Sequence, residues 1–135
     1  MSRQQEAESV TRRFFASWKS RDLEQVMAFI APDCVLVNGA LGTHRGADAI
    51  RTLFAPYFES CTRLEFRLLG TAAAADGDRV HNERLDVLEF GDKCLEIPVA
   101  GVVELAGGQI VAMRDYFDSA AVDAQRAGWD KKVKD

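Results

Sequence analysis

The chain has 135 residues, of which 47% are hydrophobic and 28% are charged, and its formal net charge is −4. This length suits a domain with a core of its own, and we expect a single domain over residues 1–135. The negative balance argues against nucleic acid as a partner, because binding to phosphates requires a basic face. Three lysines gather near the end, at Lys131, Lys132 and Lys134, and are expected to form a solvated tail.

No apolar segment approaches the ~20 residues that a helix needs to cross a bilayer, so no membrane partner is expected. The polar residues 1–6 are not followed by the apolar stretch of a signal peptide. Cysteine occurs at Cys34, Cys61 and Cys94, an odd number without the spacing of a metal site. We therefore expect free thiols, no bound metal and a cytoplasmic location.

The first part of the chain is expected to be helical. Residues 4–20 are predicted to form a helix, because large apolar side chains recur every four residues. These are Val10, Phe14 and Trp18. The same apolar face continues from Leu23 to Ile30 in a second helix, which Pro32 is expected to end. A short strand, 34–38, and a glycine-containing loop, 39–46, precede a third helix over residues 48–58.

The remainder is rich in strands. Four strands are predicted, at 62–74, 78–90, 93–105 and 109–117. A polar tail from Ser119 onwards is expected to be helical. Helices followed by a run of antiparallel strands are typical of the α+β class. We expect a curved, antiparallel mixed sheet with three N-terminal helices over its concave face, giving a cone with one deep pocket.

Two of the predicted strands carry charged side chains on faces that are otherwise apolar. Alternate residues of a strand share a face, so Arg84 and Asp86 point the same way. Asp115 likewise shares its face with Met113 and Phe117. An Arg–Asp pair on one strand is, taken alone, more often a structural or interface salt bridge. Two carboxylates and a guanidinium on one apolar wall indicate a buried acid–base site, because burial drives pKa values apart.

The turns between the strands decide whether these charges meet. A two-residue turn at Gly91-Asp92 places Arg84 opposite Val99. At the next turn, a two-residue loop, Gly107-Gly108, would turn Asp115 away from Arg84, whereas a three-residue loop that begins at Ala106 turns it toward the same wall. We expect the three-residue loop, with Gly108 left-handed. The wall then consists of Arg84, Asp86, Leu88, Ile97, Val99, Gly101, Val103, Val111, Met113, Asp115 and Phe117.

Three segments resemble a known family: Glu83-Arg84-Leu85-Asp86-Val87-Leu88, Gly101-Val102-Val103-Glu104-Leu105 and Arg114-Asp115-Tyr116-Phe117-Asp118. They resemble the limonene-1,2-epoxide hydrolase family, part of the cone-shaped fold group of nuclear transport factor 2, ketosteroid isomerase and the SnoaL-like proteins. The resemblance extends from about Glu6 to Asp123, and the N-terminal half matches only the fold group. It implies a homodimeric, cofactor-independent epoxide hydrolase without a metal.

The resemblance also implies roles for individual residues. Asp115 would be the base that activates water, Asp86 the acid, and Arg84 the bridge between them; the residues alone would allow the two aspartates to exchange roles. Asn38 would help to hold the water. The family's water-holding tyrosine, two residues earlier, is replaced by Leu36. Asn38 also falls where ketosteroid isomerases carry an aspartate base, and an asparagine cannot shuttle a proton, so that isomerase route is not expected.

We therefore expect hydrolysis of a small-to-medium apolar epoxide to a vicinal diol. The substrate pocket is expected to include Trp18, Leu36, Leu53, Tyr57, Leu88, Ile97, Val99, Met113 and Phe117. Two alternatives stay open, an epoxide-opening cyclase or isomerase and a non-catalytic domain that binds small molecules. The natural substrate, its stereochemistry and the pathway are not specified by the sequence. A homodimer through the back of the sheet is predicted from outward apolar residues, namely Leu85, Val87, Val102, Ala112 and Tyr116.

Overall fold

The protein was analysed as a computed structural model, which describes residues 1–129. The lysine cluster at Lys131, Lys132 and Lys134 lies outside the described residues. The elements in chain order are α1 (Arg3–Ser17), the 3₁₀ turn η1 (Trp18–Ser20), α2 (Leu23–Met27), β1 (Ile30–Asn38), the 3₁₀ turn η2 (Gly39–Leu41), β2 (Thr43–Arg45), α3 (Ala47–Ser60), β3 (Arg63–Ala73), β4 (Arg79–Phe90), β5 (Lys93–Ala106), β6 (Gln109–Tyr116) and α4 (Ser119–Arg126).

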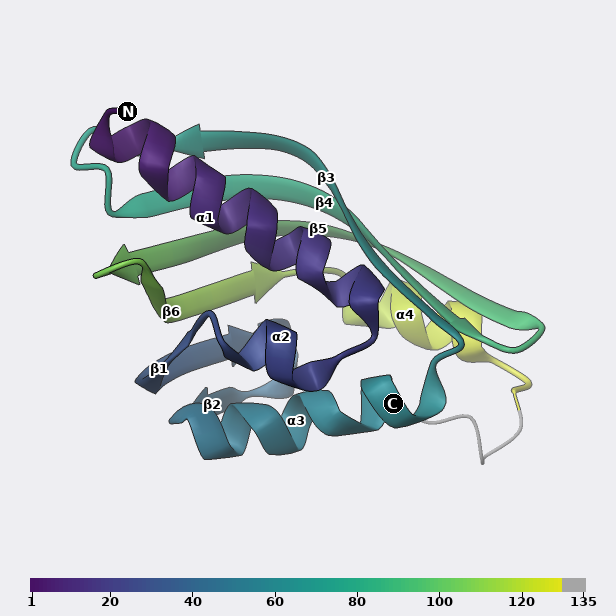
Figure 1. The fold of residues 1–135 in the computed structure, drawn as a ribbon. Helices are drawn as coiled ribbons and strands as arrows, with labels where there is room; N and C mark the ends of the chain where they lie inside the picture. Colours follow the sequence, from purple (N-terminus) through teal and green to yellow (C-terminus); the bar gives the residue numbers. More distant parts are fainter. Residues whose placement is uncertain (130–135) are drawn as a thin grey trace.

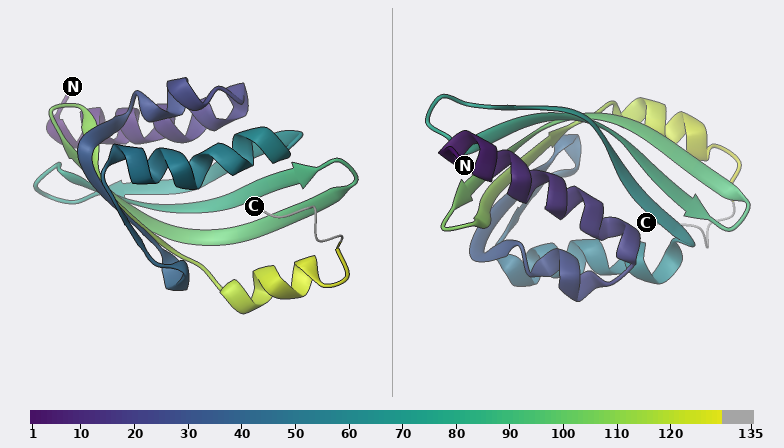
Figure 2. Two further views of the ribbon diagram at one scale, coloured as in Figure 1. Left: turned by 90° about the horizontal axis from the view of Figure 1, so that it is seen from below. Right: turned by 45° about the horizontal axis from the view of Figure 1, so that its top comes forward.

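The strands form one curved sheet in the order β2-β1-β6-β5-β4-β3, antiparallel except for the parallel pair β1 and β6. Helices α1, α2 and α3 lie over the concave face, and α4 lies against the opposite face (Figures 1 and 2). The α+β class and the three N-terminal helices over a curved mixed sheet are thus confirmed. Within residues 1–129, the helices all fall short of the length and apolar character that a membrane span requires.

Helix starts follow local capping chemistry. Ser2 and Gln5 form a capping box at the start of α1, and the side chain of Asp22 accepts a hydrogen bond from Glu24 N at the start of α2. The second helix is shorter than predicted, because Ile30 belongs to β1 and pairs with Ile110 of β6. Burial of Ile30 against a neighbouring strand outweighs the helical pattern.

The loop predicted over residues 39–46 contains a further strand. Thr43–Arg45 forms β2, in which His44 pairs with Leu36 of β1. The chain reverses through η2 and Gly42, whose φ of +114° suits glycine. The backbone N–H of Asn38 donates to the carbonyl of Gly42 at 2.9 Å and closes this reversal. The side chain of Asn38 is thereby held at the end of β1.

The turn between β4 and β5 matches the prediction, since Phe90 pairs with Lys93 and Arg84 pairs with Val99. The predicted three-residue loop between β5 and β6 is wrong. Ala106 pairs with Gln109, so the loop contains two residues, Gly107 and Gly108, with φ of +59° and +79°. Positive φ at both central residues is the backbone of a tight hairpin turn whose twist suits the strands.

The extra residue lies in β6 instead of the turn. Leu105 pairs with Ile110, but Glu104 pairs with Ala112, so Val111 is the additional residue of a β-bulge. Ile110 is fully buried where the prediction placed Val111 on the wall. Asp115 consequently lies opposite Gly101, not opposite Val99, which is where a three-residue loop pairing Leu105 with Gln109 would have placed it. It still faces the concave side, because the bulge shifts the alternation of side chains by one residue, as the longer loop would have done.

The convex face of the sheet is partly covered by α4. Gln125 of this helix hydrogen-bonds the backbone of Glu96 twice, through Glu96 N at 3.0 Å and Glu96 O at 2.8 Å. Val87, which pairs with Glu96, is only 3% exposed. The expectation that Val87 adds to an uncovered apolar surface is therefore wrong. Tyr116 is 54% exposed on β6.

Candidate active site

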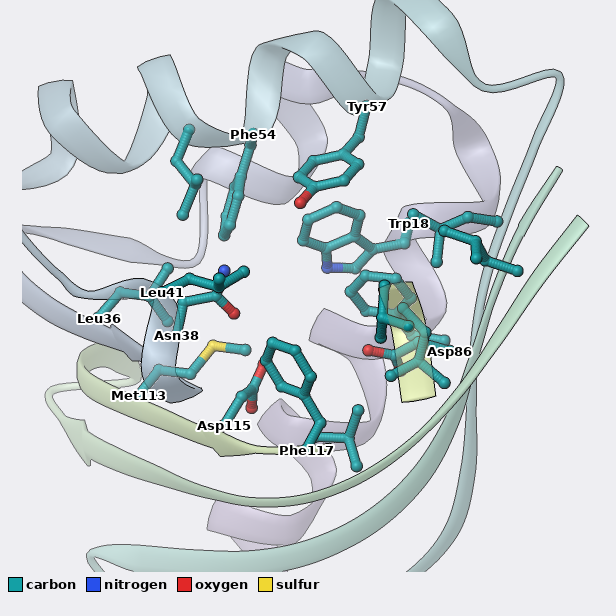
Figure 3. Close-up of a pocket in the computed structure, with 17 residues that line it drawn as sticks. Trp18, Leu36, Asn38, Leu41, Phe54, Tyr57, Asp86, Met113, Asp115 and Phe117 are labelled. Carbon is teal, nitrogen blue, oxygen red and sulfur yellow. The ribbon is translucent and has the colours of Figure 1, made fainter. Parts of the chain in front are cut away.

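A pocket opens between the concave face of the sheet and the helices (Figure 3). It contains about 720 Å³ of atom-free space, which includes its opening to solvent. The lining residues are Trp18, Leu36, Asn38, Leu41, Leu53, Phe54, Tyr57, Phe66, Asp86, Leu88, Leu95, Ile97, Val99, Met113, Asp115, Phe117 and Val122. Most of the wall is apolar, and Figure 3 shows the amide of Asn38 and the carboxyl groups of Asp86 and Asp115 directed toward one open space, with the hydroxyl of Tyr57 and the indole nitrogen of Trp18 also at its edge.

Arg84 bridges the two aspartates from beneath the pocket floor. Its Nε and Nη2 atoms donate to the two carboxylate oxygens of Asp86, each at 3.0 Å. Nη1 and Nη2 donate to the carboxylate oxygens of Asp115 at 3.1 and 3.0 Å. One planar guanidinium therefore holds two carboxylates, each through a pair of hydrogen bonds, which gives both a defined orientation.

The three charged groups are buried, with exposures of 1% for Arg84, 7% for Asp86 and 8% for Asp115. The guanidinium of Arg84 also lies over aromatic rings, 4.3 Å from the centre of the Phe15 ring and 5.5 Å from that of Phe66. Burial by itself would lower the pKa of Arg84, but the two aspartates outweigh it and raise the pKa above its ordinary value. The guanidinium therefore stays charged.

The two carboxylates share a single cation. Burial is the largest influence on Asp86 and raises its pKa above the ordinary value of 3.8; Arg84 opposes this rise, and the charge of Asp115 adds to it. One arginine neutralises one carboxylate, so the site is electrically balanced when the other carboxyl keeps its proton. The four hydrogen bonds from Arg84 treat the two carboxylates alike, and the direction of the pKa shift marks Asp86 as a carboxyl that keeps its proton more readily than a free aspartate.

Gly101 makes room for the bridge. It lies on β5, between Asn82 of β4 and Asp115 of β6. A Cβ atom at this position would be 2.8 Å from Asp115 Oδ1 and 3.0 Å from Arg84 Nη1. Because no side chain fills this space, the arginine reaches across β5 to the aspartate on the next strand.

Asn82 is a member of the network that sequence reasoning missed. Its Oδ1 accepts a hydrogen bond from Arg84 Nη1 at 2.9 Å, and the residue is 6% exposed. Asn82 could have been predicted to contact Arg84, because it lies two residues before Arg84 and therefore on the same face of β4. The amide fixes the end of the guanidinium that faces Asp115.

Asn38 and Asp115 are register partners across the parallel pair of strands β1 and β6. Both line the pocket, so an amide and a carboxylate lie side by side at its polar end (Figure 3). Leu36, two residues before Asn38, also lines the pocket and is 3% exposed. A hydrocarbon side chain thus occupies a place from which a polar residue could have contacted a bound water.

All nine residues predicted for the substrate pocket line it, as do Asn38, Asp86 and Asp115, whereas Arg84 lies behind the two aspartates. Further lining residues were missed, namely Leu41, Phe54, Phe66, Leu95 and Val122. Leu95 follows from the alternation that gave Ile97 and Val99. Phe66 required the pairing of β3 with β4, where it lies opposite Asp86. Phe14 is fully buried behind the pocket, against Trp18, and is not a lining residue.

The arrangement brings groups that can accept and donate protons to one pocket. In residues 1–129, no three side chains of the His, Cys, Asp or Glu type lie together in a way that could hold a metal ion. A carboxylate beside an amide can position and deprotonate a water, and a protonated carboxyl across the pocket can donate to a developing oxygen anion. Asp115 beside Asn38 is an arrangement of the first kind, and the carboxyl of Asp86 lines the same pocket.

Comparison with known proteins agrees with this chemistry. Epoxide hydrolase EphG from Mycobacterium tuberculosis (strain ATCC 25618 / H37Rv) is 31% identical over 105 residues, which is 78% of this chain and 68% of that protein. The structure of an M. tuberculosis LEH-like epoxide hydrolase is 27% identical, with a TM-score of 0.81, and the match covers 92% of this chain and 91% of that one.

More distant structures share the fold alone. A putative polyketide cyclase from Xanthomonas campestris pv. campestris has a TM-score of 0.82 at 18% identity, covering 92% of this chain and 98% of that one. A putative SnoaL-like polyketide cyclase from Jannaschia sp. CCS1 has a TM-score of 0.79 at 16% identity, covering 95% and 96%. The SnoaL-like, nuclear transport factor 2-like fold is therefore shown, and fold by itself does not select an activity.

The family model for the limonene-1,2-epoxide hydrolase catalytic domain matches residues 5–127 of this sequence. That range includes the bridged aspartates, the asparagine beside them and the apolar walls of the pocket. The chain therefore belongs to the limonene-1,2-epoxide hydrolase family.

Proposed function

We propose that the protein hydrolyses a small-to-medium apolar epoxide to a vicinal diol, in the manner of a limonene-1,2-epoxide hydrolase and without a cofactor. The observation that supports this proposal most strongly is the pair of buried carboxylates held by one arginine, 3.0 to 3.1 Å from its donors. Opening an epoxide with water needs a base for the water and an acid for the ring oxygen, and these two groups face one pocket.

The proposed step transfers two protons. Asp115 removes a proton from a water molecule as the water oxygen attacks a ring carbon, and the Asn38 amide oxygen accepts a hydrogen bond from the second water hydrogen. The C–O bond breaks with its electron pair moving to the ring oxygen, which takes the proton of Asp86. The product diol contains the atoms of the epoxide and of one water. Asp115 is then protonated and Asp86 ionised, and return of one proton restores the starting state.

Arg84 sets the protonation states in this proposal. Its charge favours one ionised carboxylate, and the burial of both aspartates opposes a second negative charge. Asp86 is assigned as the acid because its pKa is raised, and Asp115 as the base because it lies beside Asn38. The apolar walls would bind a hydrocarbon skeleton and limit the water that enters with it.

A second candidate is supported by Leu36. Because this side chain cannot hydrogen-bond a water, an internal hydroxyl of the substrate could be the nucleophile, and the product would be a cyclic ether. Incubation in ¹⁸O-labelled water separates the two reactions by mass spectrometry. Hydrolysis places one solvent oxygen in the product, whereas the internal attack places none.

We also propose a homodimer that packs through the convex face of the sheet, and a cytoplasmic location. The apolar residues Leu85, Val102 and Ala112 are half-buried on this face, and Tyr116 is exposed beside them. Cys34, Cys61 and Cys94 form no disulfide within residues 1–129, and Cys34 and Cys61 are buried, which suits a reducing compartment.

The decisive experiment measures diol formation by variants of the site with limonene, cyclohexene, styrene and steroid epoxides. Asp115→Asn and Asp86→Asn are each expected to abolish turnover while the protein stays folded, because the amide can neither accept nor donate the required proton. The matched control is Asp123→Asn, which changes an exposed carboxylate on α4. Normal diol formation by either site variant would refute the mechanism.

Arg84→Ala is expected to abolish turnover as well. It leaves two buried carboxylates without their cation, so we also expect a loss of about 3–5 kcal/mol in the free energy of unfolding. Thermal unfolding followed by circular dichroism checks that the aspartate variants, in contrast, are folded at the assay temperature.

A further inference from the structure

Trp18 carries a buried hydrogen-bond donor that the proposed mechanism has not used. The side chain lines the pocket and the residue is 1% exposed. Its indole Nε1 atom has no hydrogen-bond partner among residues 1–129. An indole nitrogen can only donate, and leaving a buried donor unpaired is unfavourable. An acceptor bound in the pocket beside this edge of the indole would give the N–H a partner.

The indole is held by a cluster of aromatic rings. It stacks on Phe66 with ring centres 4.2 Å apart and an interplanar angle of 23°. The Phe54 and Phe58 rings lie 4.7 and 5.2 Å away, and Phe14 meets it edge-on at 6.3 Å. Because these contacts restrict the ring, the N–H direction is set before a ligand binds, as an effective hydrogen-bond donor in catalysis requires.

The position of Trp18 relates it to the acid of the site. Its stacking partner Phe66 is the register neighbour of Asp86 across β3 and β4. Asn38 and Asp115, which would hold the water, form the corresponding pair on the same concave face, nearer the opposite edge of the sheet, across β1 and β6. Figure 3 shows the indole nitrogen on the ring edge that faces the space between these groups. An acceptor that contacts both Trp18 and Asp86 would therefore be the oxygen that Asp86 protonates.

We propose that Trp18 Nε1–H donates a hydrogen bond to the oxygen of the three-membered ring, as a second donor beside Asp86. This inference rests on the proposed epoxide hydrolysis. As the C–O bond breaks, its electron pair moves to the oxygen, Asp86 delivers the proton, and Trp18 keeps its own proton and stabilises the growing negative charge. Such preorganised donors act on the transition state more than on the bound substrate. Trp18 is then a catalytic residue as well as part of the wall.

The direct test is an NMR measurement of the indole N–H on two ligands of the same shape. Cyclohexene oxide and norcarane differ only by oxygen or CH₂ in the three-membered ring. They are added to ¹⁵N-labelled Asp115→Asn protein, in which turnover is suppressed. The chain has two tryptophans, so the spectrum contains two indole signals, and Trp129→Phe identifies the signal of Trp18. The methyl signal of Met113, which lines the pocket, reports that each ligand is bound.

We expect cyclohexene oxide to move the Trp18 signal downfield, and norcarane to leave it nearly in place while shifting the Met113 methyl signal equally. Equal responses of the indole to both ligands, or none to either, would overturn the hydrogen bond. The same negative result is expected if the N–H rests against a neighbouring ring. If neither ligand moves the Met113 signal, the pocket does not take these molecules and the inference is overturned with the proposed substrate class.

A kinetic test uses Trp18→Phe, which removes the N–H and keeps an aromatic ring. We expect kcat to fall about tenfold, as for one lost hydrogen bond to the reacting oxygen, with little change in KM or in inhibition by norcarane. Trp129→Phe is the control and should leave all three quantities unchanged. Unchanged kcat together with weaker norcarane inhibition would assign Trp18 to packing alone. If Trp18→Phe fails to fold, the NMR comparison decides, since it retains the tryptophan.

The role of Trp18 and the hydrolysis itself can be refuted independently of each other. If the native protein forms a diol but the indole signal is the same with cyclohexene oxide and with norcarane, the proposed hydrolysis stands and the proposed role of Trp18 is overturned. An indole signal that responds to the oxygen, in a native protein that forms no diol from any epoxide tested, would support the contact and overturn the hydrolysis.

Discussion

At the scale of single residues, the site depends on the absence of a side chain at Gly101. Arg84 and Asp115 stand on β4 and β6, with β5 between them, and their hydrogen bonds pass over Gly101. A Cβ atom there would also lie 3.1 Å from Asn82 Oδ1. The requirement for glycine is therefore steric and comes from the network, because the backbone of Gly101 does not have a positive φ.

We predict that Gly101→Ala separates the guanidinium from Asp115 and lowers kcat strongly. The crowded methyl group is also expected to reduce the free energy of unfolding by about 1–3 kcal/mol. Gly70→Ala is the matched control, since Gly70 also lies in a strand and a Cβ there would meet no described atom within 4 Å. Equal kcat values for the two variants, measured by diol formation, would show that the space beside Gly101 is not needed.

The raised pKa of Asp86 predicts a dependence on pH. The folded protein binds this proton more tightly than the unfolded chain, so the stabilisation is complete below pH 3.8 and is lost as pH rises through the raised pKa. The melting temperature of the native protein relative to Asp86→Asn should therefore fall with rising pH in this window. The ratio kcat/KM should decline over the same range, because the acid loses its proton. A melting difference that grows with pH would contradict the assignment.

At the scale of elements, a β-bulge in β6 gives Asp115 its direction. Ile110 faces the core before the bulge, and Met113 and Asp115 face the pocket after it, although Met113 is three positions after Ile110 and would point the other way in a regular strand. Regular alternation cannot give both. Val111 and Ala112 together oppose Glu104, and this one irregularity allows the core and the pocket to be filled by the same strand.

Two deletions of one residue test the bulge. Removing Val111 leaves a regular ladder in which Ala112 opposes Glu104 and Asp115 still opposes Gly101, so we expect diol formation to persist with a lower melting temperature. Removing Arg114 shortens the strand after the bulge and turns Asp115 to the convex face, so activity should be lost. Circular dichroism shows whether each deletion variant is folded, so that lost activity in a folded variant can be attributed to the changed direction of Asp115. Loss of activity in folded protein lacking Val111 would show that the bulge itself shapes the site.

At the scale of the whole molecule, the two faces of the sheet are covered by different elements. The concave face carries the pocket beneath α1, α2 and α3, and the convex face carries α4 over one part and leaves Tyr116 exposed on another (Figure 2). Apolar residues on an open sheet face favour a partner surface. The proposed homodimer uses this face and leaves the pocket accessible.

We predict that the protein elutes as a dimer at micromolar concentration in size-exclusion chromatography with light scattering. Tyr116→Arg should shift it toward the monomer, because a charge would be buried in the interface. Leu69→Arg is the control, since Leu69 is 59% exposed on the edge strand β3, outside the proposed contact. A native protein that is monomeric under these conditions would exclude the proposed contact.

The local sequence is enough to predict which side chains share a face within each strand. Arg84 with Asp86, and Asp115 with Met113, follow from the two-residue period of a strand, which is a local property of the backbone. The turn at Gly91-Asp92 and the pairing of Arg84 with Val99 were likewise predictable, because a tight turn links neighbouring residues. The α+β class followed from the order of helical and strand patterns.

The way in which the faces of neighbouring strands meet could not be predicted from local patterns. Whether the additional residue lies in the β5–β6 turn or in a bulge at Val111 depends on the burial of Ile110 beside β1, a contact between distant parts of the chain. The free space beside Gly101 and the stacking of Trp18 on Phe66 also depend on strands and helices that are far apart in the sequence. Such contacts depend on packing in three dimensions, which the local period of a strand or helix does not specify.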